Sequence, residues 1–216
     1  VRGNVEKYAD STELNRYGAR FKYSKFQKII DDSNQAITSN ITKVRMRRDL
    51  RVLLNTFAEY QIGFGNEFYI GNLTGYNIKS TAFRVKGIAG DVYLSDIPDS
   101  DRLNGSIFLF SVPSPNSNSV TIRRRNVGRI DYKSGIITLS AINIQSGKEK
   151  DGQQMIEISA VPQSNDVVGF QDLYLQLDVS NSTIDMVSDN IASGLDVSGS
   201  SYIVSSSYTN GNLVRV

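Results

Sequence analysis

Neighbouring carboxylates are the first side chains in this sequence that could do chemistry, because two acids can share a proton or hold a metal ion. Asp31-Asp32, and Asp99 with Asp101, have the residue types of a glycosidase dyad. Asp96 could join the second group as a metal ligand, but the segment SDIPDSD lacks the glycine and the terminal glutamate of a calcium loop. Both groups lie in turn-forming sequence, where aspartate caps backbone N–H groups. We therefore predict solvated turns, with no catalytic and no metal-binding residues.

The sequence also lacks the side chains that most enzymes use as a nucleophile or a base. It contains no histidine and no cysteine, which excludes Ser-His-Asp and Cys-His triads, His-containing zinc sites and disulfide bonds. Gly63, Gly65, Gly71 and Gly75 form a loose run, but they lie among aromatic strand residues and lack the lysine of a phosphate-binding loop. We expect a protein that is not an enzyme and that binds no cofactor.

Arginines form the densest charges in the sequence. KVRMRRDLR spans residues 43–51, and Arg129 follows a run of three arginines at 123–125. A nucleic-acid groove carries such charges, ideally between aromatic rings, whereas the residues between these arginines are aliphatic. Arginine suits protein interfaces, because its planar fork binds a carboxylate through two hydrogen bonds. We predict a subunit interface made by Arg45, Arg47, Arg51, Arg123, Arg124 and Arg125. A solvated arginine face and a nucleic-acid site are the alternatives.

Alternation along residues 43–52 predicts the strand that would position the first arginine group. Apolar residues fall on one side and basic residues on the other: Val44, Met46, Leu50 and Val52 against Lys43, Arg45, Arg47 and Arg51. Before this strand, Ser24 is the expected N-cap of a short amphipathic helix whose apolar positions are Phe26, Ile29 and Ile30.

The rest of the chain reads as short strands and turns, so the fold class is mainly β with a few short helices (α+β), in antiparallel sheets and hairpins. A hairpin is expected around Gly65-Asn66 in the segment FAEYQIGFGNEFYI. Further strands are expected at 80–86, 91–95, 106–112, 154–161 and 172–178, with Asn104-Gly105 as the turn before the third.

The clearest β pattern is a meander from Val120 to Ile144. It reads as VTIRRR, a turn at NVG, RIDY, a turn at KSG, and IITLSAINI. Alternation predicts that four of its residues lie in the core: Ile122, Ile130, Ile137 and Leu139.

Composition divides the chain into three parts. Residues 1–22 are polar and aperiodic, and are expected to form an arm or linker; residues 23–178 form the β-rich core domain; residues 179–216 form a Ser-rich C-terminal segment. A terminal hairpin is expected in the last part, because alternating residues flank Asn210-Gly211. Net charge is +2, from 24 basic and 22 acidic residues, which predicts no general attraction to nucleic acid. No stretch approaches the ~20 apolar residues of a membrane span.

Four strings in order along the chain resemble a known family. They are YSKFQKIIDDSNQAITSNITKVRMRR (23–48), YQIGFGNEF (60–68), VGRIDYKSGIITL (127–139) and EISAVPQSNDVVGFQDLYLQLD (157–178). Together they resemble the baseplate wedge subunit of T-even-like contractile-tailed bacteriophages, in its C-terminal part. The first 22 residues and the Ser-rich end add little to this resemblance.

The resemblance implies an architectural protein of the virion that is assembled in the host cytoplasm. Its partners would be copies of itself, as a homodimer or ring, and other baseplate wedge proteins. The alternative from another class is a receptor- or carbohydrate-binding β domain of a virion, for which Tyr69, Tyr76 and Asn77 could form an aromatic platform beside an amide. The absence of tryptophan, a frequent sugar-stacking side chain, disfavours that alternative.

Overall fold

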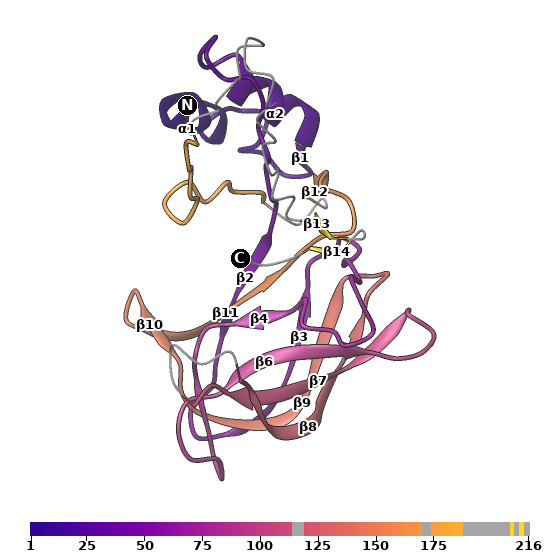
Figure 1. The fold of residues 1–216 in the computed structure, drawn as a ribbon. Helices are drawn as coiled ribbons and strands as arrows, with labels where there is room; N and C mark the ends of the chain where they lie inside the picture. Colours follow the sequence, from indigo (N-terminus) through magenta and orange to yellow (C-terminus); the bar gives the residue numbers. More distant parts are fainter. Residues whose placement is uncertain (114–118, 170–173, 188–207, 210–211, 214–216) are drawn as a thin grey trace.

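A computed structural model of the chain describes residues 1–113, 119–169, 174–187, 208–209 and 212–213. Figure 1 shows a small helical unit at one end and a larger β-rich unit at the other. The helical unit contains α1 (Arg2–Ala9), α2 (Tyr23–Asp31), and β1 (Arg20–Phe21), which pairs with β12 (Val167–Val168). Antiparallel strands dominate the described residues, which confirms the predicted fold class.

The larger of two sheets in the β-rich unit has six strands in the order β3-β9-β8-β7-β6, and β5 pairs with β9 outside this path. Every pairing is antiparallel. The strands are β3 (Phe57–Gly63), β5 (Arg84–Val85), β6 (Tyr93–Pro98), β7 (Asn104–Ser111), β8 (Thr121–Asp131) and β9 (Ile136–Ser146).

The smaller sheet has four strands in the order β10-β11-β2, and β4 pairs with β11. Its strands are β2 (Met46–Arg51), β4 (Lys79–Ser80), β10 (Lys148–Lys150) and β11 (Gln153–Ala160). The Leu94 N–H of β6 donates to the Ser80 hydroxyl of β4 at 2.8 Å, and the Ser95 hydroxyl donates to the Ile78 carbonyl at 2.9 Å. These bonds connect the edges of the two sheets.

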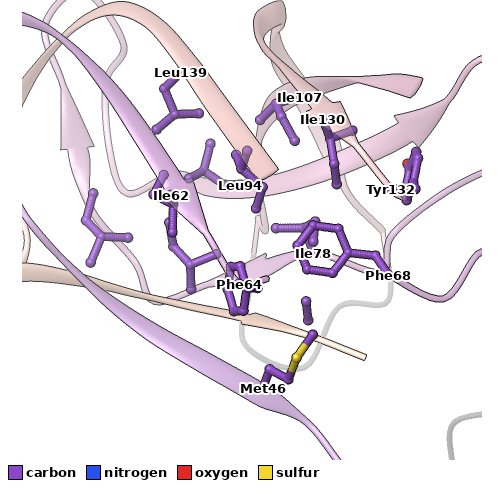
Figure 2. Close-up of a cluster of buried hydrophobic side chains, with 14 of the residues drawn as sticks. Met46, Ile62, Phe64, Phe68, Ile78, Leu94, Ile107, Ile130, Tyr132 and Leu139 are labelled. Atoms are coloured by element: carbon purple, nitrogen blue, oxygen red, sulfur yellow. The ribbon is translucent and has the colours of Figure 1, made fainter. Parts of the chain in front are cut away.

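Apolar side chains from both sheets fill the space between them (Figure 2). Ile130, Ile137 and Leu139 are buried, as alternation predicts. Ile122 is only half-buried, so its predicted place in the core is wrong. It lies opposite Phe110. Phe110 is half-buried, and its ring stacks on that of Tyr93 with the centroids 5.5 Å apart.

The predicted turn at NVG is wrong, because β8 runs without interruption from Thr121 to Asp131. Asn126 has a φ of 54°. The pairing of β8 with β7 shifts register between Ile107 and Leu109, so the strand takes up the extra residues as a bulge instead of reversing. The turn at KSG is confirmed: Gly135 has a φ of +67°, and a Cβ atom there would lie 2.1 Å from the Asn66 carbonyl oxygen.

The predicted hairpin around Gly65-Asn66 is also wrong, because β3 pairs with β9 and not with the segment that follows it. The Asn66 side chain bonds instead to Val168, donating to its carbonyl and accepting from its N–H, each at 2.9 Å. The chain after it turns to other elements, where the Phe68 N–H donates to the Tyr132 carbonyl at 2.8 Å. Contacts distant in sequence therefore replace the local hairpin.

Asn104 and Gly105 do not form the predicted turn, since both lie in β7. The reversal comes earlier, where Arg102 has a φ of 55°. There the Asp101 carboxylate accepts from the N–H groups of Leu103 and Asn104 at 2.9 and 3.1 Å. This bonding confirms that Asp101 serves a turn.

The helical unit differs from the sequence expectation at two places. Residues 2–9 form α1, which the aperiodic reading of residues 1–22 did not predict, and Val5 and Tyr8 are buried. Helix α2 begins at Tyr23, so Ser24 is not its N-cap. The carboxylate of Asp166 accepts the Tyr23 N–H at 2.8 Å and replaces a local cap.

Near the C-terminal end, the predicted strand at 172–178 is wrong for the described residues 174–178, and residues 172–173 lie outside the described part. Tyr174 makes an isolated bridge with Tyr17, and 175–178 have no strand assignment. The terminal hairpin is confirmed by the pairing of β13 (Tyr208–Thr209) with β14 (Asn212–Leu213), while its turn pair 210–211 lies outside the described residues.

Candidate subunit interface

Strand β2 presents the first arginine group as alternation predicts. Met46 is buried and Leu50 half-buried, whereas Arg45, Arg47 and Arg51 are exposed. Exposure alternates because successive side chains of a strand point to opposite faces, and only one face of β2 packs against the core.

One of these arginines is paired within the chain. The Arg47 guanidinium lies 2.5 Å from the Asp178 carboxylate and 3.3 Å from that of Asp49. Asp49 also accepts from the Lys150 ammonium at 2.7 Å, and this bond raises the pKa of Lys150. An ionic row therefore crosses the smaller sheet, and Arg47 belongs to it.

Asp178 binds Arg47 from a preorganised turn. Its carboxylate accepts from the Ser180 hydroxyl at 2.7 Å and from the Asn181 side-chain amide at 2.7 Å. These hydrogen bonds, with the nearby positive charge of Arg47, hold the pKa of Asp178 well below its ordinary value. The segment 174–180 is thereby held to β2, and the bridge between Tyr174 and Tyr17 connects it to the N-terminal part of the chain.

Arg45 and Arg51 differ from Arg47, since neither makes an ion pair with another described residue. Strand β2 is the last strand of its sheet, and its only pairing partner among the described strands is β11. Exposed arginines on an edge strand oppose its pairing with a strand of another molecule, unless that strand carries carboxylates.

The second arginine group lies on β8, in the other sheet. Arg123 donates from Nε to the Ser111 hydroxyl at 2.7 Å. Arg124 and Arg125 are exposed and make no ion pair in the described part of the chain. The structure thus places Arg47 and Arg51 on β2, Arg45 just before it, and the other three arginines on β8 of the other sheet. Arg47 is in an ion pair and Arg123 is bonded to a hydroxyl, whereas the other four have no ion-pair partner among the described residues: Arg45, Arg51, Arg124 and Arg125.

The aromatic platform of the alternative reading is used within the fold. The Asn77 side-chain amide donates to the carbonyls of Tyr69 and Val161 at 2.7 and 3.1 Å and accepts from the Val161 N–H at 2.8 Å. The Tyr76 ring lies edge-on to Phe108 at 5.4 Å. The amide that a bound sugar would need is therefore occupied by backbone groups.

A buried polar pair also escaped prediction. Asp96 lies inside β6 and not in a solvated turn, so that expectation is wrong for this residue. Its carboxylate accepts from the Tyr132 hydroxyl at 2.5 Å and from the Ile78 N–H at 2.7 Å. Burial raises the pKa of Asp96, and burial followed by the charge of Asp96 raises the pKa of Tyr132. These bonds connect β6 to Ile78, the residue before β4, and to Tyr132, the residue after β8.

The other carboxylates considered above serve local structure. Asp99 pairs with Arg129 at 2.9 Å, and Asp31 accepts from the Asn40 side chain at 2.5 Å. Among the described residues, no cluster of three or more Asp or Glu side chains could hold a metal ion. No helix of the described part is long and apolar enough to span a membrane.

Comparison with known proteins gives one family. Residues 1–49 match the family model of the baseplate structural protein gp6, C-terminal domain III. This segment contains the whole of α1, β1 and α2 and ends at Asp49 inside β2. No curated protein matches the chain. The gp6 match supports a baseplate wedge subunit of T4-like phages and a structural role in the phage tail baseplate.

Proposed function

We propose that this chain builds the baseplate wedge by associating with copies of itself and with other wedge proteins, in the host cytoplasm, and that it catalyses no reaction. The observation that carries the proposal is a set of four exposed arginines that have no ion-pair partner in the described part of the chain: Arg45 just before β2, Arg51 at its end, and Arg124 and Arg125 on β8. Buried against carboxylates of another subunit, such arginines would form desolvated, two-point ion pairs.

The proposal is tested by charge reversal on β2. We expect Arg45→Glu with Arg51→Glu to weaken assembly by about tenfold or more, because one lost partner of an interfacial charge pair costs ~2 to 5 kcal/mol. Unfolding should change little, because both side chains are exposed. The measurement is oligomer mass by light scattering, together with binding to the purified wedge proteins of the same phage.

The matched control carries the same change of charge elsewhere. Lys25 and Arg84 are exposed and pair with Glu13 and Asp91 at the surface, and neither lies on β2 or β8. Lys25→Glu with Arg84→Glu should leave assembly intact. Equal assembly by both double variants would contradict an arginine interface on β2. A selective loss of binding to short DNA, with assembly intact, would favour the nucleic-acid alternative.

The absence of catalysis is tested separately. We expect no turnover above blank on broad ester, phosphate and glycoside panels, since the chain has no histidine or cysteine. Turnover abolished by one carboxylate substitution would contradict it.

A further inference from the structure

The turn between β2 and β3 presents an apolar group between two charges of opposite sign. Leu53, Leu54 and Phe57 are 61%, 38% and 65% exposed. Arg51 precedes them at the end of β2, Glu59 follows them in β3, and both charged side chains are exposed. Single exposed apolar residues are ordinary, whereas a group of them on a protein surface marks a contact site.

Hydrogen bonds hold the backbone of this turn. The Leu53 N–H donates to the Tyr60 hydroxyl at 3.0 Å, and the Asn55 N–H donates to the Ile144 carbonyl at 2.8 Å. Asn55 has a φ of 57°, in the left-handed region that asparagine tolerates. A turn that is already ordered loses less conformational entropy when it binds a partner.

The two charges of the turn have no counter-charge in their own chain. Neither Arg51 nor Glu59 makes an ion pair with a described residue. Phe57 and Glu59 are exposed while Ala58 between them is half-buried, so the carboxylate and the ring project from the same face of β3. A partner that covers the apolar group must therefore supply both a cation and a carboxylate, because a charge buried without a partner is costly.

The order of these residues is self-complementary. Leu53 and Phe57 stand two positions before and after Asn55. Arg51 and Glu59 stand four positions before and after it. In a contact with two-fold symmetry, each residue i of one copy meets residue j of the other, and j meets i. A two-fold axis near Asn55 would thus bring arginine to glutamate twice and apolar to apolar side chains between them.

We infer that two copies of this chain associate through the β2–β3 turn, residues 51–59, about a two-fold axis. Leu53 and Phe57 form the apolar centre of the contact, and Arg51 of each copy pairs with Glu59 of the partner subunit at its rim. The inference rests on the proposed self-association, and it names the surface that is used and the carboxylate that Arg51 binds.

Another surface of the chain satisfies only one charge of the turn. The hollow of about 270 Å³ beside α1 is lined in part by Glu6, Asp10 and Leu177. Its carboxylates and its apolar side chain could accept Arg51 from a second copy, but they would meet Glu59 with like charge. A second copy of the turn provides a counter-charge for both residues, which favours contact between two turns.

The nearest other cation, Lys86, lies on the far side of β9. Its N–H donates to the Asn143 carbonyl at 3.0 Å, whereas the Asn55 N–H donates to the carbonyl of the next residue, Ile144. Successive carbonyls of a strand point to opposite edges, so Lys86 and the turn flank β9 from opposite sides. Lys86 is exposed and is therefore a matched control for a change of charge near the turn.

The test measures self-association of the whole chain by light scattering over a concentration series. We expect Arg51→Glu and Glu59→Arg, made separately, each to raise the dissociation constant at least about tenfold. Their thermal midpoints should stay unchanged, because both side chains are exposed. An equimolar mixture of the two single variants should associate as the parent does, because each variant supplies the charges that the other lacks.

Two further variants test the apolar centre and the site of the charge. Leu53→Ser with Phe57→Ser should also weaken self-association at least about tenfold, since both side chains would be desolvated in the contact. Lys86→Glu should associate as the parent does. Equal weakening by Lys86→Glu would overturn the inference, because the loss would then follow net charge and not the turn.

The remaining outcomes separate this inference from the proposed function. Two dissociated single variants whose mixture stays dissociated overturn the pairing of Arg51 with Glu59, while self-association through arginine stands. Loss of association in Glu6→Gln with Asp10→Gln, but not in Glu59→Arg, places the contact at the hollow beside α1 and overturns the inference alone. A parent chain that neither self-associates nor binds any wedge protein of the same phage overturns the proposed function as well.

Discussion

Individual side chains in this protein have roles that depend on the residues around them, even where their types are alike. Arg47 and Arg51 both project from β2, yet Arg47 is held by Asp178 and Asp49 while Arg51 is unpaired among the described residues. Asp96 and Asp101 both come from one acidic segment, yet Asp96 is buried against Tyr132 while Asp101 caps a turn. The effect of replacing one residue must therefore be predicted from the contacts that this residue makes.

Ile137 is 1% exposed, at the centre of the core. Replacing it with alanine should lower the free energy of unfolding by about 2 to 5 kcal/mol, because buried methyl groups are lost and a cavity remains. Ile122→Ala should cost clearly less, since Ile122 is half-buried. Urea denaturation of the three proteins measures both; equal midpoints for Ile137→Ala and the parent would remove Ile137 from the core.

Asp96 should make stability depend on pH. Its pKa is raised in the folded protein, so between the ordinary carboxyl pKa and the raised value the folded state binds more protons than the unfolded state. Stability therefore falls as pH rises through this window. In Asp96→Asn this fall should disappear. Denaturation of both proteins from about pH 4 to about pH 8 measures the difference, and identical slopes would show that Asp96 titrates as an ordinary carboxylate.

At the scale of elements, partners distant in sequence set the limits of helices and strands. Helix α2 takes its cap from Asp166, β3 pairs with β9, and the segment 174–180 is fixed by Arg47. The cap of α2 and the ion pair to the segment 174–180 are each made by a side chain of another segment, so a substitution there removes the contact and leaves the element's own sequence unchanged.

The cap of α2 gives a direct comparison. Asp166→Ala should destabilise the protein by about 0.5 to 2 kcal/mol, as the loss of a capping side chain does elsewhere. Ser24→Ala should have little effect, because Ser24 lies inside the helix and is not its N-cap residue, which is Lys22. Thermal denaturation followed by circular dichroism ranks the two variants, and a larger cost for Ser24→Ala would reverse the assignment.

The ion pair between Arg47 and Asp178 should control the segment 174–180 locally. Arg47→Ala should change global stability by about 1 kcal/mol or less, since exposed pairs contribute little. It should nevertheless speed hydrogen exchange in residues 174–180, because it removes their bond to β2. Arg51→Ala is the control.

Lowering the pH should also speed hydrogen exchange in residues 174–180, because it protonates Asp178. The pKa of Asp178 is lowered by folding, so its contribution is present above the ordinary carboxyl pKa and is lost as pH falls through the lowered value. Exchange in residues 174–180 that is the same in the parent and Arg47→Ala would show that this ion pair does not hold the segment.

The whole molecule joins a helical unit to a β-rich unit through strands shared by both (Figure 1). Residues 1–49 match the gp6 domain, but β1 needs β12, and β2 needs β11. The helices in this segment have 8 and 9 residues, below the ~12 to 15 that isolated helices need in water.

Residues 1–49 expressed alone should therefore be largely unfolded. Circular dichroism should show little helix, and thermal unfolding should lack a cooperative transition, in contrast to the full chain. A cooperative transition in the fragment would show that the helical unit folds without the strands from the rest of the chain.

The sequence by itself determined the features that depend on local repetition and composition. Alternation identified β2 and three buried residues of the meander, Ile130, Ile137 and Leu139, because one covered face imposes a two-residue period. The resemblance, carried by its ordered strings, pointed to the baseplate family that the match to residues 1–49 supports.

Only the tertiary structure decided which groups pair across long separations. The Asn66 amide bonds to Val168, 102 residues away, instead of making a hairpin, and Asp166 caps a helix 143 residues before it. Such bonds form only where the folded chain brings two groups close together in space. That distance cannot be predicted from the residue types or from their spacing in the sequence. For the same reason, six arginines look alike in the sequence, and the fold placed carboxylates beside one of them, Arg47.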